Sequence, residues 1–171
     1  QQKNVKPIFI PELKRELNLI NDIKAFKKIL DIVRTENPDI IHTHTAKAGT
    51  LGRMAGLYYN LLVRPFARNK AILIHTFHGH VLEGYFGKFK TSLFVLVEKI
   101  LARFTKKIIT VSESVKKELL SLGIAETDKI TVIPLGLELE KFINLPPRHG
   151  NATDAVSVGI VGRLVPIKNH H

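Results

Sequence analysis

The stretch DIIHTHTAKAGTLGRMAGLYYNLL, residues 39–62, combines two sequence patterns. Its first part, DIIHTHT (39–45), is short, apolar and β-branched, which predicts a strand. The part that follows, KAGTLGRMAGLYYNLL (47–62), predicts a helix, and AILIHT (71–76) predicts a second strand. A strand, a helix and a strand in this order indicate a βαβ unit.

The same alternation continues along the chain. Further strands are predicted at Lys6–Ile10, 108–111 and 129–134, and helices at Asn18–Glu36, 88–104 and 114–123. Short apolar strands that alternate with helices build a parallel sheet covered on both faces. The sequence therefore predicts an α/β fold, a Rossmann-like parallel sheet flanked by helices.

A change in composition divides the chain. Residues 1–143 form the first predicted domain, and 144–154 (NLPPRHGNATD) read as a linker because they are rich in Pro and polar residues. AVSVGIVGRL (155–164) predicts a fresh strand, so 155–171 would open a second domain. We expect a truncated chain, in which the first domain lacks its first strand or strands.

The charge and the composition narrow the class of partner. The formal net charge is +11, which suits nucleic acid, anionic lipid headgroups or phosphorylated small molecules. The basic residues are spread over many segments, as on solvated helix faces, so a nucleic-acid-binding domain remains only an alternative. The chain has no cysteine, which excludes disulfides and thiolate metal sites.

Histidines gather after two of the predicted strands. His42 and His44 share one face of an extended strand, and HTFHGH (75–80) follows the next strand. A metal-dependent hydrolase using His42 and His44 with the 75–80 histidines is therefore an alternative reading. Later strand ends offer only Glu113 as a carboxylate, and neither D-x-D nor H-E-x-x-H is present, so we predict no metal.

The segment 75–80 lies where open α/β sheets place their ligand crevice. Gly79 lets the backbone bend there, and a neutral histidine can exchange hydrogen bonds with a sugar hydroxyl. The alternative for each histidine is a structural role, hydrogen-bonded to neighbouring backbone.

Glycines and cations suggest two further contacts. Gly49, Gly52 and Gly56 lie inside the predicted helix rather than at its first turn, so we expect them to let it press against the sheet rather than to bind a dinucleotide. In VGIVGRLVPIKN (158–169), Arg163 and Lys168 follow a predicted strand and suit a diphosphate, although a solvated loop explains them equally.

Taken together, these motifs resemble the family-4 glycosyltransferases, retaining enzymes of the two-domain GT-B fold. DIIHTHTAKAGTLGRMAG, HTFHGH, ITVSES, KITVIPLGLELEKF and VGIVGRLVPIKN occur in the family's order, from about Asp39 to the end of the chain. The resemblance implies transfer of a sugar from a nucleotide-sugar donor to a glycan or lipid-linked acceptor hydroxyl, with retention and without a metal or other cofactor. It also implies polysaccharide or glycolipid synthesis and no nucleic-acid partner.

The resemblance assigns roles residue by residue. It places His78 as the catalytic residue beside the donor sugar and the acceptor. It matches Arg163 and Lys168, with Gly162, to the donor diphosphate. The residues that it assigns to the cleft or the acceptor are His44, Lys47, Gly79 and Gly136. Leu135 and Glu138 depart from the family's usual Asn and Asp, so neither side chain is given a role. Because the donor pocket would be incomplete, we expect the isolated fragment to be inactive.

The helix predicted at 88–104 suggests a membrane contact. Its apolar stripe comprises Phe89, Leu93, Leu96, Val97, Ile100 and Phe104, with Lys and Arg elsewhere. Many family members act at the cytoplasmic membrane, so the expected location is cytoplasmic, with this helix resting peripherally on anionic headgroups. In the alternative, the stripe packs on the sheet as in an ordinary amphipathic helix.

Overall fold

A computed structural model describes residues 7–14, 16–66, 70–79, 88–136, 138 and 140–143. The chain divides into two compact units, residues 1–134 and 135–171. The described part of the second unit contains a short helix, α5 (Glu140–Ile143). The predicted linker at 144–154 and the strand expected at 155–164 lie outside the described residues.

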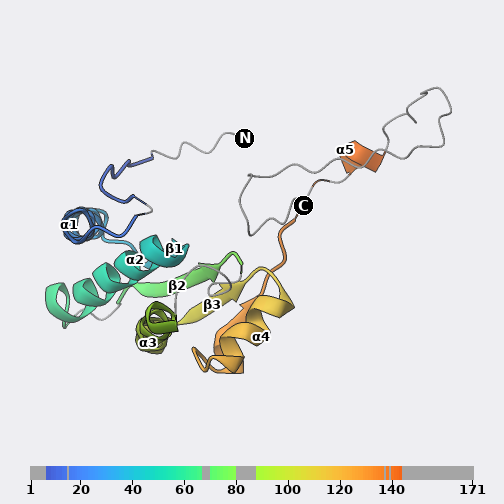
Figure 1. Ribbon diagram of the computed structural model, residues 1–171. Coiled ribbons are helices and arrows are strands. Elements are labelled where there is room, and N and C mark those ends of the chain that lie inside the picture. Colours follow the sequence, from blue (N-terminus) through green and yellow to red (C-terminus); the bar gives the residue numbers. More distant parts are fainter. Residues whose placement is uncertain are drawn as a thin grey trace, which may run out of the picture. The chain divides into compact units, whose positions relative to one another are not determined.

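The first unit contains a four-stranded sheet in the order β1-β2-β3-β4 (Figure 1). All neighbouring strands are parallel. The strands are β1 (Ile40–His44), β2 (Ile72–Phe77), β3 (Lys107–Thr110) and β4 (Ile130–Val132). The helices are α1 (Leu19–Glu36), α2 (Ala46–Tyr58), α3 (Lys88–Phe104) and α4 (Glu113–Ser121). A π-helical turn (Tyr59–Val63) continues α2, and a 3₁₀ turn (Thr127–Lys129) precedes β4. The predicted Rossmann-like α/β fold is confirmed.

Local sequence sets the ends of these helices. At the start of α1, Asn18 is the N-cap: its side chain accepts a hydrogen bond from the backbone N–H of Asn21 at 3.0 Å. The helix ends at Asn37, which adopts a left-handed conformation with φ of 46°. After α4, Gly123 takes a positive φ of 62°, which favours glycine and stops the helix.

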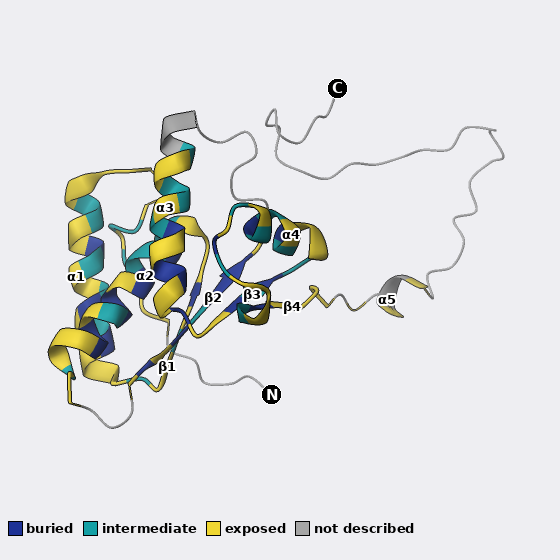
Figure 2. Ribbon diagram, turned by 90° about the horizontal axis from the view of Figure 1, so that it is seen from below, coloured by how far each residue is buried: buried dark blue, intermediate teal, exposed yellow. Residues whose placement is uncertain are grey.

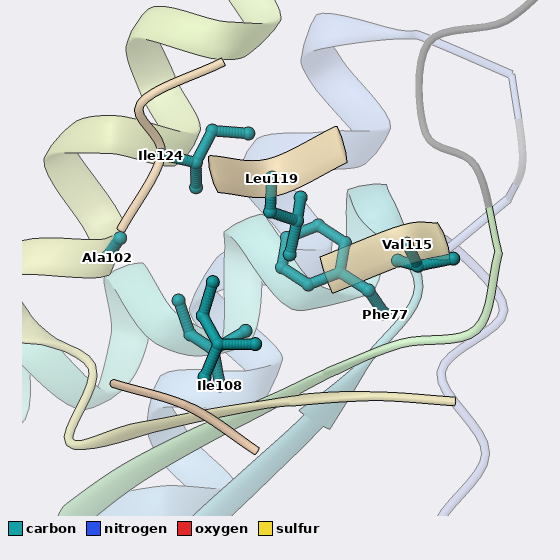
Figure 3. Packing of buried hydrophobic residues seen from close by; sticks show 7 residues of the cluster. Phe77, Ala102, Ile108, Val115, Leu119 and Ile124 are labelled. Atoms are coloured by element: carbon teal, nitrogen blue, oxygen red, sulfur yellow. The ribbon is translucent and has the colours of Figure 1, made fainter. Parts of the chain in front are cut away.

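The connecting helices α2, α3 and α4 pack on one face of the sheet. Because the strand order is monotonic and parallel crossovers are right-handed, each successive helix falls on the same side. The core on that side joins Phe77 and Ile108 of the sheet to Ala102 of α3 and to Val115 and Leu119 of α4 (Figure 3). The opposite face is more open, with Ile40 and Ile72 exposed. For the described residues, the expected helical cover on both faces is therefore wrong.

A second correction concerns the strand predicted at Lys6–Ile10. Residues 7–10, the described part of this segment, are not in a strand. Pro7 and Pro11 remove two of the N–H donors that a strand needs, and the side chain of Phe9 is 86% exposed. Just after this segment, Glu12 forms an ion pair with Lys28 of α1 at 2.6 Å.

The third correction concerns the apolar stripe of α3. Its buried side carries Glu98, Leu101 and Ala102, whereas Leu93, Leu96 and Ile100 are about half exposed. The alternative in which the whole stripe packs on the sheet is therefore wrong, because Glu98, Leu101 and Ala102 form the contact side instead. Within the described part of the chain, no helix is long and apolar enough to cross a membrane.

Candidate functional site

The glycines of α2 allow this helix to lie directly against the sheet. A Cβ added at Gly49 would lie 2.9 Å from Nδ1 of His75, and one at Gly52 would lie 2.7 Å from the methyl group of Thr43. A Cβ at Gly56 would collide with Leu73 at 2.5 Å. The prediction that these glycines serve close packing is confirmed.

His75 lies in the polar layer beneath α2. Its side chain is fully buried, and its Nδ1 shares a hydrogen bond of 2.8 Å with the hydroxyl of Thr43. Burial, reinforced by the nearby Arg53 guanidinium, lowers the pKa of His75 to about 3. This imidazole is therefore neutral near pH 7. The first histidine of HTFHGH thus takes the structural role left open by the sequence, although its partner is a side chain rather than the backbone.

A buried ion pair joins α2 to α3 beside this layer. Nη2 of Arg53 donates to both carboxylate oxygens of Glu98, at 2.7 and 2.8 Å, and Nε donates to the carbonyl of Gly49 at 3.0 Å. Both side chains are fully buried. Burial raises the pKa of Glu98, and the Arg53 guanidinium opposes that rise.

A histidine cluster occupies the other face of the same two strands. His44 at the end of β1 is paired in register with Thr76 of β2, and His78 follows Thr76 by two residues. As a result, Nδ1 of His44 and Nε2 of His78 are 2.9 Å apart, where one ring must donate a hydrogen and the other accept it. His42 lies beside them, with its ring centroid 4.3 Å from that of His44. The predicted shared face of His42 and His44 is confirmed.

Within this cluster, the surroundings of His44 favour its neutral form. Partial burial lowers the pKa of His44, and the neighbouring His42 and His78 lower it further because protonated rings repel one another. His44 and His78 are both exposed, so a ligand can reach them. Two hydrogen-bonded imidazoles at a strand end can donate a hydrogen bond to a sugar hydroxyl or accept one from it.

Lys47 is turned toward α1. Its ammonium group forms an ion pair with Asp22 at 2.5 Å and donates to the backbone carbonyl of Glu16. The side chains of Lys47 and Asp22 are only 16% and 19% exposed. The structure therefore gives Lys47 an anionic partner within the chain, beside its predicted acceptor role.

The turn between β1 and α2 contains a strained residue that the sequence did not reveal. Thr45 has φ of 62° and ψ of 164°, a region that is almost restricted to glycine. Its side chain does not cap α2, and the first turn of that helix carries no acidic residue. The turn thus places strained backbone and the positive end of α2 directly after His44.

The other predicted site residues fall into two groups. Gly79 follows His78, and a Cβ added there would meet no atom within 4 Å. A Cβ added at Gly136, which belongs to the second unit, would likewise meet no atom within 4 Å. The predicted site residues that lie outside the described part of the chain are His80, Gly162, Arg163 and Lys168.

The described histidines do not form a metal site. Nε2 of His42 bonds to the hydroxyl of Thr76 at 2.8 Å, and His44 and His78 bond to each other. Among the residues that the structure describes, no group of three His, Cys, Asp or Glu side chains is placed to hold a metal ion.

Sequence comparison identifies the class of protein to which this domain belongs. The model of Glycosyltransferase Family 4 matches residues 2–141, most of the chain. The chain therefore belongs to glycosyltransferase family 4, as its motifs predicted.

Two curated relatives resemble the chain along nearly its whole length. It is 30% identical, over 97% of its residues, to the UDP-Gal:alpha-D-GlcNAc-diphosphoundecaprenol alpha-1,3-galactosyltransferase of Escherichia coli. It is 32% identical, over 93% of its residues, to the capsular polysaccharide biosynthesis glycosyltransferase CapM of Staphylococcus aureus. The chain spans 42% of the length of each relative. A solved S. aureus MnaA–UDP structure matches 68% of this chain and 29% of its own, with 18% identity and a TM-score of 0.46.

Proposed function

We propose that this chain forms the acceptor-side domain of a retaining glycosyltransferase. The reaction moves a sugar from a nucleotide-sugar to a glycan or lipid-linked acceptor hydroxyl, in the synthesis of a surface polysaccharide or glycolipid. It takes place at the cytoplasmic face of the membrane and uses no bound metal. The observation that carries this proposal is the His44–His78 pair at the carboxyl edge of a family-4 domain.

The geometry of the pair suggests how His78 acts. If Nε2 of His78 donates to Nδ1 of His44, the remaining ring nitrogen of His78, Nδ1, is an acceptor. That nitrogen can accept a hydrogen bond from a sugar hydroxyl beside the reacting carbon and so orient it. His44 then fixes the tautomer and the orientation of His78, and the absence of side-chain bulk at Gly79 leaves room for the sugar.

The donor diphosphate is assigned to the chain beyond the described sheet. Arg163 and Lys168, after Gly162, supply two cations that would stabilise the negative charge developing on a departing nucleoside diphosphate. Gly136 and Lys47 stay in the proposal as weaker cleft contacts. Lys47 would contact the acceptor there while its ammonium group stays paired with the Asp22 carboxylate.

The named activities of the relatives guide the choice of substrates. The E. coli relative carries UDP-Gal and a GlcNAc-diphosphoundecaprenol acceptor in its name, so UDP-galactose is the first donor to test here. The S. aureus relative is named for capsular polysaccharide synthesis, which supports the same class of product.

The test measures nucleoside diphosphate release from a panel of nucleotide-sugars with EDTA present. It uses the 171-residue chain and, alongside it, the product of the complete reading frame. We expect one donor to be cleaved by the longer product without metal, and the activity to be lost in His78→Ala, Arg163→Ala and Lys168→Ala. We expect no turnover by the 171-residue chain alone.

Two results would overturn the proposal. Hydrolysis that requires added metal, with every nucleotide-sugar left intact, would favour the metal-dependent hydrolase using His42 and His44. Salt-sensitive binding to nucleic acid without any effect of nucleotide-sugars would favour the nucleic-acid-binding domain.

A further inference from the structure

The third histidine of the cluster, His42, has no part in the proposed reaction, yet a specific contact holds its ring. Its Nε2 lies 2.8 Å from the hydroxyl oxygen of Thr76, a hydrogen bond between neighbouring strands. Thr76 is only 5% exposed, and its β-branched side chain has little rotational freedom at χ1. Figure 2 shows the contrast between the two strands: β1 is mostly exposed, whereas β2 is buried along most of its length. A fixed group on β2 therefore holds an exposed ring on β1.

The direction of this hydrogen bond brings His42 toward His44. In the parallel register, His42 pairs with Ile74, whereas Thr76 pairs with His44. The bond from His42 to Thr76 therefore runs diagonally, toward the carboxyl end of the strands. Side chains two positions apart on a strand leave the backbone about 7 Å from each other. The ring centroids of His42 and His44 are nevertheless 4.3 Å apart, so the two rings converge.

His44 needs such a neighbour because its own side chain is exposed. The χ2 torsion of histidine is broad, and a half-turn of the ring would move Nδ1 away from His78 and break the 2.9 Å hydrogen bond. The His42 ring, inclined at 42° to that of His44, packs beside it and restricts this rotation. Partial burial and then the proximity of His42 lower the pKa of His44, so the two rings also interact electrostatically.

We infer that His42 and Thr76 are positioning residues for His78. The Thr76 hydroxyl holds the His42 ring, which limits the rotation of His44. His44 in turn fixes the tautomer and the orientation of His78. Neither His42 nor Thr76 has to touch the substrate. The inference rests on the proposed function, in which His78 orients a sugar hydroxyl beside the reacting carbon, and it adds two residues that act on the reaction indirectly.

The first part of the test measures the ring ¹⁵N shifts of the histidines in the ¹⁵N-labelled 171-residue chain, because these shifts report the tautomer of each ring. Thr76→Val removes the hydroxyl and keeps the branched shape, whereas Thr76→Ser keeps the hydroxyl. We expect Thr76→Val to shift the ring signals of His44 and His78 as well as those of His42. Thr76→Ser should leave all three near their wild-type positions. A merely structural role of Thr76 would not carry a change as far as His78.

The second part measures kcat and KM for the product of the complete reading frame, with UDP-galactose or the donor that the panel identifies. Thr76→Val and His42→Phe should each lower kcat about tenfold or more and leave KM within about twofold, because a misplaced His78 impairs alignment rather than binding. Thr76→Ser should recover most of the activity. Thr43→Val is the matched control. It breaks a threonine–histidine bond of 2.8 Å on the covered face, so it should lower stability and leave kcat unchanged.

A double-mutant cycle tests whether the effect passes through His44. His44→Gln removes the ring that links His42 to His78. Adding Thr76→Val to His44→Gln should therefore cost little further activity, because residues that act in one network are not additive.

Three results would overturn the inference. The first is unchanged ring signals of His44 and His78 in the folded Thr76→Val chain. The second is a His42→Phe enzyme with a raised KM and an unchanged kcat, which would make His42 a direct substrate contact. The third is losses in kcat that multiply when Thr76→Val and His44→Gln are combined. Each of these leaves nucleotide-sugar cleavage by the wild type intact, whereas a wild-type enzyme that cleaves no nucleotide-sugar would overturn the proposed function itself.

Discussion

The two faces of the β1–β2 strand pair use histidine in opposite ways. On the face covered by α2, His75 is fully buried, bonded to Thr43 and kept neutral. On the open face, His44 and His78 are exposed and share one hydrogen bond. His75 and His78 are only three residues apart. Because side chains alternate along a strand, neighbouring positions are divided between the scaffold and the candidate site.

The comparison shows what each face tolerates. The covered face depends on glycines, a buried ion pair and a neutral imidazole, so changes there should alter stability. The open face carries groups that a ligand can reach, so changes there should alter binding and catalysis and leave the fold intact.

The largest effect is expected from breaking the buried ion pair. Glu98→Gln leaves the Arg53 guanidinium buried without its counter-charge and should lower the free energy of unfolding by about 3–5 kcal/mol. Urea unfolding followed by circular dichroism measures this loss.

The paired change Arg53→Met/Glu98→Leu provides the control, because it removes both charges together and should recover most of the lost stability. A single Glu98→Gln variant as stable as wild type would show that Arg53 and Glu98 are not a buried pair in solution.

Gly49→Ala should be the next largest change. The added methyl group meets the His75 ring, which Thr43 holds in place, so overpacking should cost about 1–3 kcal/mol. Gly79→Ala is the matched control on the open side, where an added Cβ meets nothing, and should unfold like wild type. In the His75→Ala background, Gly49→Ala should cost much less, and an equal cost in both backgrounds would contradict the contact.

Acid should destabilise the fold through His75. In the folded chain the pKa of His75 is about 3, below the ordinary value of 6.5. At a pH between these two values, the unfolded chain therefore binds one proton more than the folded chain. The stabilising effect of neutral His75 is complete above pH 6.5 and falls by about 1.4 kcal/mol per pH unit as the pH drops toward 3. Urea unfolding between about pH 7 and pH 5 measures how the free energy of unfolding depends on pH. His75→Asn should reduce this dependence by the contribution of one proton, about 1.4 kcal/mol per pH unit. A slope that His75→Asn leaves unchanged would assign the acid sensitivity to other groups.

The smallest effect is expected at Lys47. Asp22→Asn removes a partly buried charged contact and should cost about 1–2 kcal/mol. It should also raise the rate at which Lys47 is acetylated, as measured by mass spectrometry. Asp31→Asn, whose contact with Arg34 is 3.8 Å long and exposed, should change neither quantity. Equal Lys47 reactivity in wild type and Asp22→Asn would show that the ion pair is not formed in solution.

Much of the fold could be predicted because its signals are local. Asn18 and the periodicity of α1 give the limits of that helix, and β-branched runs between helices give the parallel strands. The glycines of α2 were correctly interpreted as packing residues because they lie inside the helix and not at its first turn. That the side chains of His42 and His44 lie on the same face of β1 could be predicted from the alternation of side chains along a strand alone.

The features that were missed depend on tertiary packing. The apolar stripe of α3 predicts that its own side of the helix is buried. The side that is buried instead carries Glu98, the only acidic residue of that helix, which pairs with Arg53 of α2. An arginine inside a helix rich in small residues was the available signal for this pair. The prediction of a strand at Lys6–Ile10 was wrong because a strand needs a neighbouring strand to pair with, and the local sequence does not show whether one is present. The same holds for Thr45, whose unusual backbone is set by the turn around it.

The division of roles between the two faces is tested most directly by a histidine titration of the ¹⁵N-labelled chain by NMR. Ring signals of His44, His75 and His78 would be assigned through single His→Gln variants. The structure predicts that His75 stays neutral down to about pH 5, and that His44 titrates below its ordinary value and responds to His78→Gln. If His75 titrates near 6.5, His75 is not buried in solution, and if the titration of His44 does not respond to His78→Gln, the His44–His78 pair is not formed.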